Sequence, residues 1–393
     1  MRSSSSSPER LARRRTRFGR TAAGPALVCC LTLIYCFNTA RALDPNRGSS
    51  DYTRGRLGAE QGFPGATVYA ITQTPDGYLW LGTERGLVRY DGINFHLYGQ
   101  EDSPLFPTGP IQELLTDADG NLWIRPQTRS LLRYRDGALQ DMTPELDAAR
   151  SGVTAMCRGA DGAALFAVRS EGVFAHAGGR FTKLFSTAER PNWLVIAMTA
   201  TGDGKVWMGT RDAGLLVMSA GRVSEVQGLP DRKVNSLLAA ADGKVWIGTD
   251  GGVVRLNGDG TDPTVAPAPL DRIQSFALLA DHDSNVWAGT SRGLFRLNDA
   301  GVSALEDAAQ DAAAVNAIFE DREGSLWVGS AGGLERLRDN AFMTYQPPDG
   351  LPPEGGAVYV DAEGRAWIAP LSGGLYRGEG GRFTPVKEAG LDR

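Results

Sequence analysis

Hydrophobic and polar positions follow one pattern that repeats eight times along the chain. Each copy has an apolar residue, an acidic turn five positions later, an aromatic residue, a small pair, and then Gly-Leu or a near equivalent. Each copy divides into four short strands separated by turn residues, and helical periodicity is absent. The repeat therefore predicts an all-β fold, a β-propeller of seven to eight four-stranded blades. The acidic turn position recurs at intervals of 39 to 43 residues, at Asp76, Asp119, Asp161, Asp203, Asp242, Asp283, Glu323 and Glu363.

In the first copy, strands are expected at 68–72, 79–83, 87–90 and 95–98. The Asp-Gly pair between the first two strands suits a tight hairpin turn. Eight copies fit one eight-bladed ring, or seven blades with an eighth copy that closes the ring or opens a second propeller. The spacing does not choose between these arrangements.

The aromatic residue of each copy is predicted to form the structural core of the repeat. A single four-stranded blade cannot bury both faces, so this side chain is expected to pack against a neighbouring blade. In the third copy Phe166 comes one residue late, and Leu165 is in strict register. The predicted core residues are Trp80, Trp123, Phe166, Trp207, Trp246, Trp287, Trp327 and Trp367.

An arginine follows Gly-Leu by two residues in the better copies. Because it belongs to the repeat, a structural ion pair or hydrogen bond along the third strand is expected of it. These arginines are Arg89, Arg133, Arg255, Arg296, Arg336 and Arg377.

The N-terminus has the pattern of a secretory signal peptide, with clustered arginines before an apolar stretch of about 16 residues and then Ala40-Arg41-Ala42. We expect residues 1–42 to be a signal peptide or an N-terminal anchor, 43–59 a linker, and 60–393 the propeller. Removing residues 1–42 takes away eight arginines and one glutamate and changes the net charge from −5 to −12. Such acidity excludes general nucleic-acid binding. Cys157 is then the only cysteine, and it is expected to be a small buried hydrophobe.

The sequence motif of these copies is similar to that of one known repeat family. Asp-Gly-Tyr-Leu-Trp-Leu-Gly-Thr at 76–83, followed by Gly-Leu-Val-Arg-Tyr-Asp-Gly at 86–92, closely resembles the two-component regulator propeller repeat. The resemblance covers about residues 60–377. Three copies depart from it: the second has Arg125-Pro126 where Gly-Thr is expected, the third has Phe166-Ala167-Val168, and the eighth has Ala369-Pro370.

The resemblance implies a periplasmic ligand-sensing ectodomain. In typical members such a domain precedes a β-sandwich, a membrane span, and a histidine kinase or diguanylate cyclase. The chain is therefore expected to be a truncated sensor, a split gene product or a stand-alone relative without its own output domain. It is also expected to be periplasmic or secreted, or anchored to the inner membrane by its N-terminal segment.

A ligand site is expected on one face of the ring. The loops between second and third strands open there together with the loops that enter each next inner strand. Convergent positive charges at this face would attract a small-molecule or oligosaccharide ligand that is anionic. The alternative is that these are solvated loops whose neighbouring acids cancel the field. The candidate ligand-binding residues are Arg85, Arg129, Arg169, Arg211 and Arg292.

Trp193 is the only tryptophan outside the repeated position, and it lies just before the inner strand of the fourth copy. It would face the same side and could stack on a sugar or aromatic ligand. The alternative is packing onto an adjoining loop. The chain is also expected to bind a partner sensor subunit or to associate with a second copy of itself.

Catalytic chemistry is not predicted. His96, His176 and His282 occupy different registers of the repeat, and no Gly-x-Ser-x-Gly elbow occurs. No catalytic residue, metal or cofactor is therefore predicted. The alternative function is a secreted propeller enzyme, a lyase or hydrolase that acts on a carbohydrate or lactone-like substrate.

Overall fold

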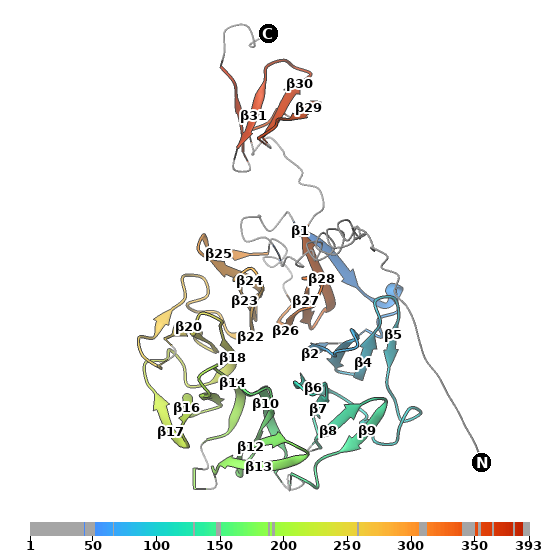
Figure 1. Ribbon diagram of the computed structural model, residues 1–393, viewed down its shortest axis with the longest axis vertical. Coiled ribbons are helices and arrows are strands. Elements are labelled where there is room, and N and C mark those ends of the chain that lie inside the picture. The colour runs from blue at the N-terminus through green and yellow to red at the C-terminus, as the bar shows by residue number, and fades with distance from the viewer. Residues whose placement is uncertain are drawn as a thin grey trace, which may run out of the picture. The chain divides into compact units, whose positions relative to one another are not determined.

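The structure is a computed structural model, and Figure 1 shows its ribbon. The segment predicted as a signal peptide, residues 1–42, lies outside the described residues. Among the described residues, no helix is long and apolar enough to cross a bilayer. The described residues are Leu43, 52–65, 67–128, 130–146, 151–187, 189–190, 193–257, 259–305, 313–339, 350–352, 355–363, 365–379 and 382–387.

The described residues form eight four-stranded antiparallel sheets and one 3-10 turn, η2 (Ala59–Gln61), which confirms the all-β prediction. Sheets one to four are β2 (Val68–Gln73), β3 (Leu79–Thr83), β4 (Gly86–Tyr90), β5 (Phe95–Leu97); β6 (Ile111–Thr116), β7 (Leu122–Pro126), β8 (Leu132–Arg135), β9 (Ala138–Asp141); β10 (Val153–Arg158), β11 (Ala164–Val168), β12 (Gly172–Ala177), β13 (Arg180–Phe185); and β14 (Val195–Ala200), β15 (Val206–Thr210), β16 (Leu215–Ser219), β17 (Arg222–Val226). Sheets five to eight are β18 (Val234–Ala239), β19 (Val245–Thr249), β20 (Gly252–Leu256), β21 (Thr264–Val265); β22 (Ser275–Ala280), β23 (Val286–Thr290), β24 (Gly293–Asn298), β25 (Gly301–Ala304); β26 (Val315–Glu320), β27 (Leu326–Ser330), β28 (Gly333–Asp339) with β1 (Tyr52–Leu57); and β29 (Gly356–Val360), β30 (Ala366–Pro370), β31 (Tyr376–Glu379), β32 (Arg382–Pro385).

Seven of these sheets are the blades of one closed ring (Figure 1). The inner strands contact one another in the order β2, β6, β10, β14, β18, β22 and β26, and β26 returns to β2. Because the ring closes between the seventh sheet and the first, the eighth sheet, β29–β32, is not one of its blades. The structure thus has a seven-bladed ring, and the eighth copy of the repeat forms a separate sheet outside it. We number the blades one to seven from β2 onward.

The ring is closed by a strand from the N-terminal side of the first copy. β1 pairs antiparallel with β28 over six residue pairs, from Tyr52 opposite Asp339 to Leu57 opposite Leu334, and supplies the outer strand of blade seven. The prediction that 43–59 is a linker is therefore wrong for β1, and residues 44–51 lie outside the described residues. The sequence of this segment lacks the repeat, but its strand satisfies the backbone groups that the third strand of blade seven would otherwise expose.

Most of the repeated aromatic residues are buried between blades. Six of the tryptophans donate the indole N–H to a side chain six positions earlier, as Trp287 Nε1 does to Asp281 Oδ2 at 2.7 Å. Trp246 and Trp367 are only half-buried. The fully buried side chains of this set are Trp80, Trp123, Phe166, Trp207 and Trp287, and Trp327 is 3% exposed.

Blade three places its aromatic residue differently from the other blades. Phe166 is buried, but it packs against Trp123 of the preceding blade, with ring centroids 4.8 Å apart. Leu165 packs with Val195 and Met198 of the following blade, as the tryptophans of other blades do. The role predicted for Phe166 therefore belongs to Leu165, because the side chains of successive strand residues point to opposite faces of a sheet.

The recurrent third-strand arginines lie opposite the tryptophans. Arg336 is the strand partner of Trp327, and its guanidinium lies 5.3 Å from the centre of the indole ring. Arg133 and Arg255 have the same relation to Trp123 and Trp246, at 5.9 and 5.8 Å. In these blades a cation–π contact over the tryptophan takes the place of the expected ion pair, and Arg133 also makes the expected kind of hydrogen bond, donated to Gln140 on the fourth strand.

Candidate functional site

In most blades the loop between second and third strands has the same hydrogen-bonded geometry. In blade one the Thr83 hydroxyl accepts a hydrogen bond from the Arg85 backbone N–H at 3.2 Å and donates one to the Gly86 carbonyl at 2.8 Å. In blade six Thr290 makes the same two bonds, to Arg292 at 3.0 Å and to Gly293 at 2.8 Å. A buried threonine therefore fixes the backbone of this loop in blades one, four, five and six, whereas the loop of Arg169 in blade three has Val168 at this position.

The structure describes four of the five predicted arginines, and all four are exposed. Arg85 donates a hydrogen bond from Nη1 to the Pro64 carbonyl at 2.5 Å. The side chains of Arg169, Arg211 and Arg292 make no hydrogen bond or ion pair with any described residue. Arg129, the fifth candidate, lies outside the described residues. Antiparallel strand order places these loops at one end of the ring, with the turns between first and second strands at the other end.

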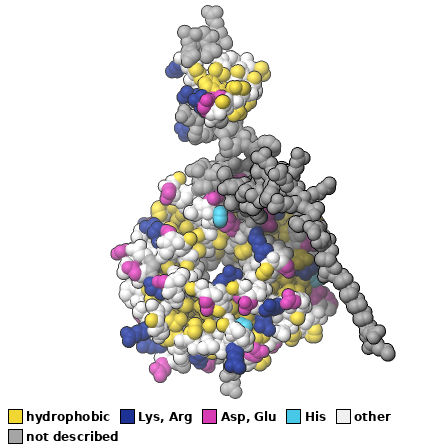
Figure 2. All heavy atoms as spheres, in the orientation of Figure 1, with side chains coloured by type: hydrophobic (Ala, Val, Ile, Leu, Met, Phe, Trp, Pro, Cys, Tyr) yellow, Lys and Arg dark blue, Asp and Glu magenta, His cyan; other side chains and the backbone are white. Residues whose placement is uncertain are grey.

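Acidic groups accompany these arginines. Glu171 forms an ion pair with Lys183 at 3.0 Å, so its charge is partly compensated. Asp250, in the corresponding loop of blade five, accepts hydrogen bonds from Asn235 at 2.8 Å and from Lys233 at 3.2 Å. Figure 2 shows basic and acidic side chains interspersed on the face turned toward the viewer. Because Glu171 and Asp250 belong to the same set of loops, the exposed arginines share their end of the ring with acidic side chains.

Trp193 is half-buried against the core of blades three and four. Its ring is stacked with Phe185 at 6.0 Å, and the Arg190 guanidinium lies 5.1 Å from its ring centre. Both contacts use indole surface that a stacked ligand would need. The geometry favours the packing alternative for this residue.

An ion pair that sequence reasoning passed over lies in blade two. Glu113 on the inner strand faces Arg125 on the second strand, with Oε2 and Nε 2.8 Å apart. Glu113 Oε1 also accepts the backbone N–H of Met156 in blade three at 2.9 Å. Burial raises the pKa of Glu113, and the Arg125 guanidinium opposes that rise. The sequence could have indicated this pair, because the second copy has two charged residues at positions where the other copies have small residues.

The small residues at this position have a clear structural reason. A Cβ added to Gly209 would lie 2.5 Å from Val234 Cγ1, because the inner strand of the next blade approaches there. Blade two replaces that close approach with polar contacts to blade three. In the other six blades the paired residues are Ala70 and Gly82, Ala155 and Ala167, Ala197 and Gly209, Ser236 and Gly248, Ala277 and Gly289, and Ala317 and Gly329.

The three histidines belong to three different blades. His96 on β5 lies 3.1 Å from Asp102, and His282 stands in the turn before β23. His176 on β12 is buried, and its ring meets Trp123 edge-on at 4.9 Å. Among the described residues, no group of three His, Cys, Asp or Glu side chains is arranged to hold a metal ion.

His176 gives the fold a pH dependence. Burial lowers the pKa of His176, and the nearby Arg133 lowers it further, while Asp117, Glu145 and Asp119 act in the opposite direction. The unfolded chain then takes up a proton near pH 6.5, where the folded chain does not, so stability falls as the pH drops below that value.

We expect the urea midpoint to decrease between about pH 7.5 and about pH 5.5, and the decrease to be smaller in His176→Phe. The other two histidines are unchanged between the two proteins, so the comparison isolates His176. An equal decrease in both proteins would show that His176 does not cause it.

Cys157 is buried and unpaired, which confirms its predicted role as a small hydrophobic residue. Burial raises the pKa of its thiol, and the carboxylate of Glu113 adds to the rise. The thiol therefore stays protonated and is unsuited to nucleophilic chemistry.

Comparison with known proteins agrees with this architecture. The sequence profile described as "Two component regulator propeller" matches residues 62–85, 228–251 and 310–332. No match was found among curated proteins.

Among solved structures, the extracellular domain of a hybrid two component system from B. thetaiotaomicron is 22% identical, with a TM-score of 0.63, over 87% of this chain and 50% of that one. The extracellular domain of a one component system from the same organism is 19% identical, with a TM-score of 0.60, over 87% and 48%. The chain therefore spans about half the length of these domains. Virginiamycin B lyase from Staphylococcus aureus is 15% identical, with a TM-score of 0.58, over 73% and 99%.

At these identities the solved structures establish the propeller fold alone. The profile matches identify the repeat, because they fall on blades one, five and seven. The chain therefore carries the repeats of the two-component regulator propeller family.

Proposed function

We propose that this chain is a periplasmic ligand-sensing or interaction propeller of a two-component-type signalling protein. The family of its repeats supports a role in signalling. The ring offers a rigid frame on which loops of variable sequence present side chains. The site residues would act by binding, and the response would follow from a change in the contacts of the propeller with another sensor subunit or with a second copy of itself.

The ligand would be an anionic small molecule or oligosaccharide bound at the loops between second and third strands. The observation that carries this proposal is that Arg169, Arg211 and Arg292 are exposed and have no partner among the described residues. The loops of Arg211 and Arg292 are also held by the buried residues Thr210 and Thr290. Arginine presents a planar fork of donors that matches carboxylate and phosphate groups. Loops held by buried threonines lose little conformational entropy on binding.

A thermal-shift screen of residues 43–393 against uronates, aromatic acids, phosphates and oligosaccharides tests this proposal. We expect one class to raise the melting temperature, and Arg211→Ala to reduce that shift. Arg222→Ala is the matched control, because Arg222 is an exposed arginine on the outer strand of the same blade. Equal shifts in Arg211→Ala, in Arg292→Ala and in the parent would place the ligand elsewhere.

The alternative from the sequence, a secreted lyase or hydrolase, needs acid and base groups that converge on one site. The three histidines lie in three blades, and His176 is buried against Trp123. The likeness to a lyase extends to the fold alone. Sensing is therefore the function that the described side chains support better.

A further inference from the structure

One blade lacks the acceptor that holds the repeated tryptophan in the others. The indole N–H bonds to a side chain six residues earlier, which is a hydroxyl in two copies and a carboxylate in four. In blade five the residue at this position is Ala240, which has no acceptor. The acceptors in the other copies are Thr74 at 2.8 Å, Asp117 at 2.8 Å, Thr201 at 3.3 Å, Asp281 at 2.7 Å, Asp321 at 2.6 Å and Asp361 at 2.8 Å.

Trp246 is consequently left with an open N–H. Its Nε1 has no hydrogen-bond acceptor among the described residues, and its side chain is half-buried, whereas Trp207 and Trp287 in the adjacent blades are fully buried. Arg255 lies over the ring at 5.8 Å and has no carboxylate within ion-pair distance among the residues described. The indole N–H that is occupied in the adjacent blades is therefore available here, beside an arginine that has no ion pair among the described residues.

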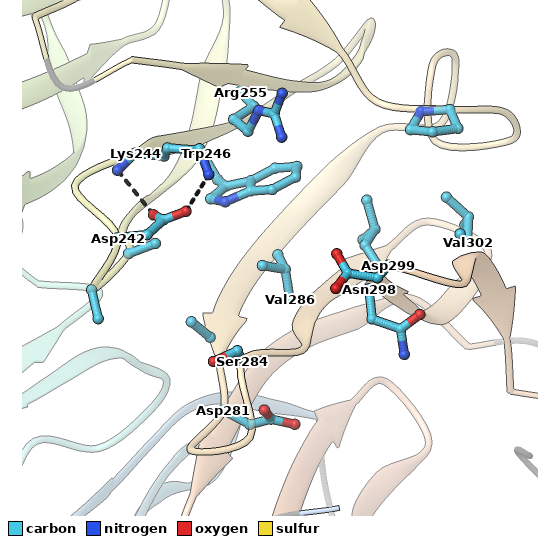
Figure 3. A pocket seen from close by; sticks show the side chains of 16 residues that line it. Asp242, Lys244, Trp246, Arg255, Asp281, Ser284, Val286, Asn298, Asp299 and Val302 are labelled. Carbon is cyan, nitrogen blue, oxygen red and sulfur yellow. Dashed lines mark hydrogen bonds and ion pairs between the residues drawn. The ribbon is translucent and has the colours of Figure 1, made fainter. Parts of the chain in front are cut away.

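A cavity of about 350 Å³ adjoins these donors, between blades five and six. Figure 3 shows the Trp246 indole pointing into it, with Arg255 above the ring and Val286, Asn298 and Asp299 across the space. This volume falls within the range of small-molecule sites. The cavity lies at the end of the ring formed by the turns between first and second strands, and the arginine loops lie at the other end.

The charges around the cavity indicate what it would bind. Blades two, six and seven each combine a tryptophan, its cross-strand arginine and a carboxylate on the indole N–H. Blade five has the tryptophan and Arg255 but no carboxylate.

The neighbouring acidic side chains do not replace the carboxylate that blade five lacks. Asp242 is paired with Lys244, and Asp281 is engaged by Trp287 and Asn285. Asp299 is exposed on the far side of the space.

We propose that the cavity beside Trp246 binds a small carboxylate ligand, whose carboxylate takes the place of the missing aspartate side chain. One ligand oxygen accepts the Trp246 N–H, and the Arg255 guanidinium balances the charge. The rest of the ligand occupies the space toward Val286. This site is independent of the function proposed for the arginine loops.

Titration calorimetry with acetate, benzoate and galacturonate, and with glucose as a neutral control, tests the proposal. We expect at least one carboxylate to bind and glucose not to bind. Ala240→Asp supplies the internal acceptor that Asp281 provides in blade six, so it should raise the melting temperature and weaken carboxylate binding by about tenfold or more. Trp246→Phe, which keeps the ring and removes the donor, should also weaken binding.

Matched variants separate this site from other effects. Arg336→Gln changes the equivalent arginine of blade seven, where Asp321 already holds Trp327, and should leave carboxylate binding unchanged. Arg211→Ala should also leave it unchanged, which distinguishes this site from the arginine loops. Ala240→Val adds bulk without an acceptor and should not raise the melting temperature.

The absence of any carboxylate binding at millimolar concentration would overturn the proposal. So would binding that is undiminished in Ala240→Asp, or a stabilisation by Ala240→Val equal to that by Ala240→Asp.

Discussion

Deleting residues 1–58 is expected to open the ring and to lower the free energy of unfolding by about 5 kcal/mol or more. The deletion removes β1 and with it Tyr52, which is 5% exposed, packs 6.4 Å from Trp287 and receives a hydrogen bond from Arg296. It also breaks the ion pair between Arg54 and Glu335 at 2.8 Å. Loss of one buried aromatic side chain alone costs about 3–5 kcal/mol.

The deletion also leaves β28 as an unpaired edge, so we expect association of the variant as well as lower stability. Guanidinium unfolding and gel filtration measure the two effects. Deletion of residues 1–42 is the control, because it retains Leu43 and β1. Equal unfolding midpoints for the two deletions would contradict closure of the ring by β1.

The second large loss of stability is expected from Asp281→Ala in blade six. This substitution removes the acceptor of the tryptophan N–H, which blade five lacks naturally at Ala240. Asp281 is 7% exposed and accepts hydrogen bonds from Trp287 Nε1 at 2.7 Å and from Asn285 Nδ2 at 2.8 Å. Its removal leaves buried donors unsatisfied, and we expect a loss of about 3 kcal/mol.

Thermal unfolding of Asp281→Ala beside Asp283→Ala measures this effect. Asp283 lies in the same turn and makes no side-chain hydrogen bond to a described residue, so its replacement should change stability by about 0.5 kcal/mol or less. A loss of similar size in both variants would mean that the bond to Trp287 does not stabilise blade six.

The repeat predicted the strands of each blade well because turn residues and alternation are local signals. In the first copy the expected strands at 79–83 and 95–98 correspond to β3 (Leu79–Thr83) and β5 (Phe95–Leu97). Ring closure was not predictable in the same way. β1 lies outside the repeat, and only the pairing of Tyr52 with Asp339 far along the chain identifies it as part of blade seven.

For the site residues, too, some features were predictable from the sequence and others were not. That the loop arginines are exposed followed from the position of loops in a propeller. The open N–H of Trp246 did not, because its cause is the absence of a side chain at Ala240, and a missing acceptor becomes visible only when the partners of the other tryptophans are known. The contact of the Glu113–Arg125 pair with blade three was also not predictable from the sequence. It is recognised only when the close approach of neighbouring blades, as at Gly209, is known.

Hydrogen exchange with and without the ligand chosen by the thermal-shift screen tests the central claim, that ligand is bound at the arginine loops. We predict slower exchange in the loops at 83–86, 168–172, 210–214 and 290–293, because bound ligand would restrict their opening. Slower exchange confined to the turns at 75–78, 202–205 and 241–244, at the other end of the ring, would contradict ligand binding at the arginine loops.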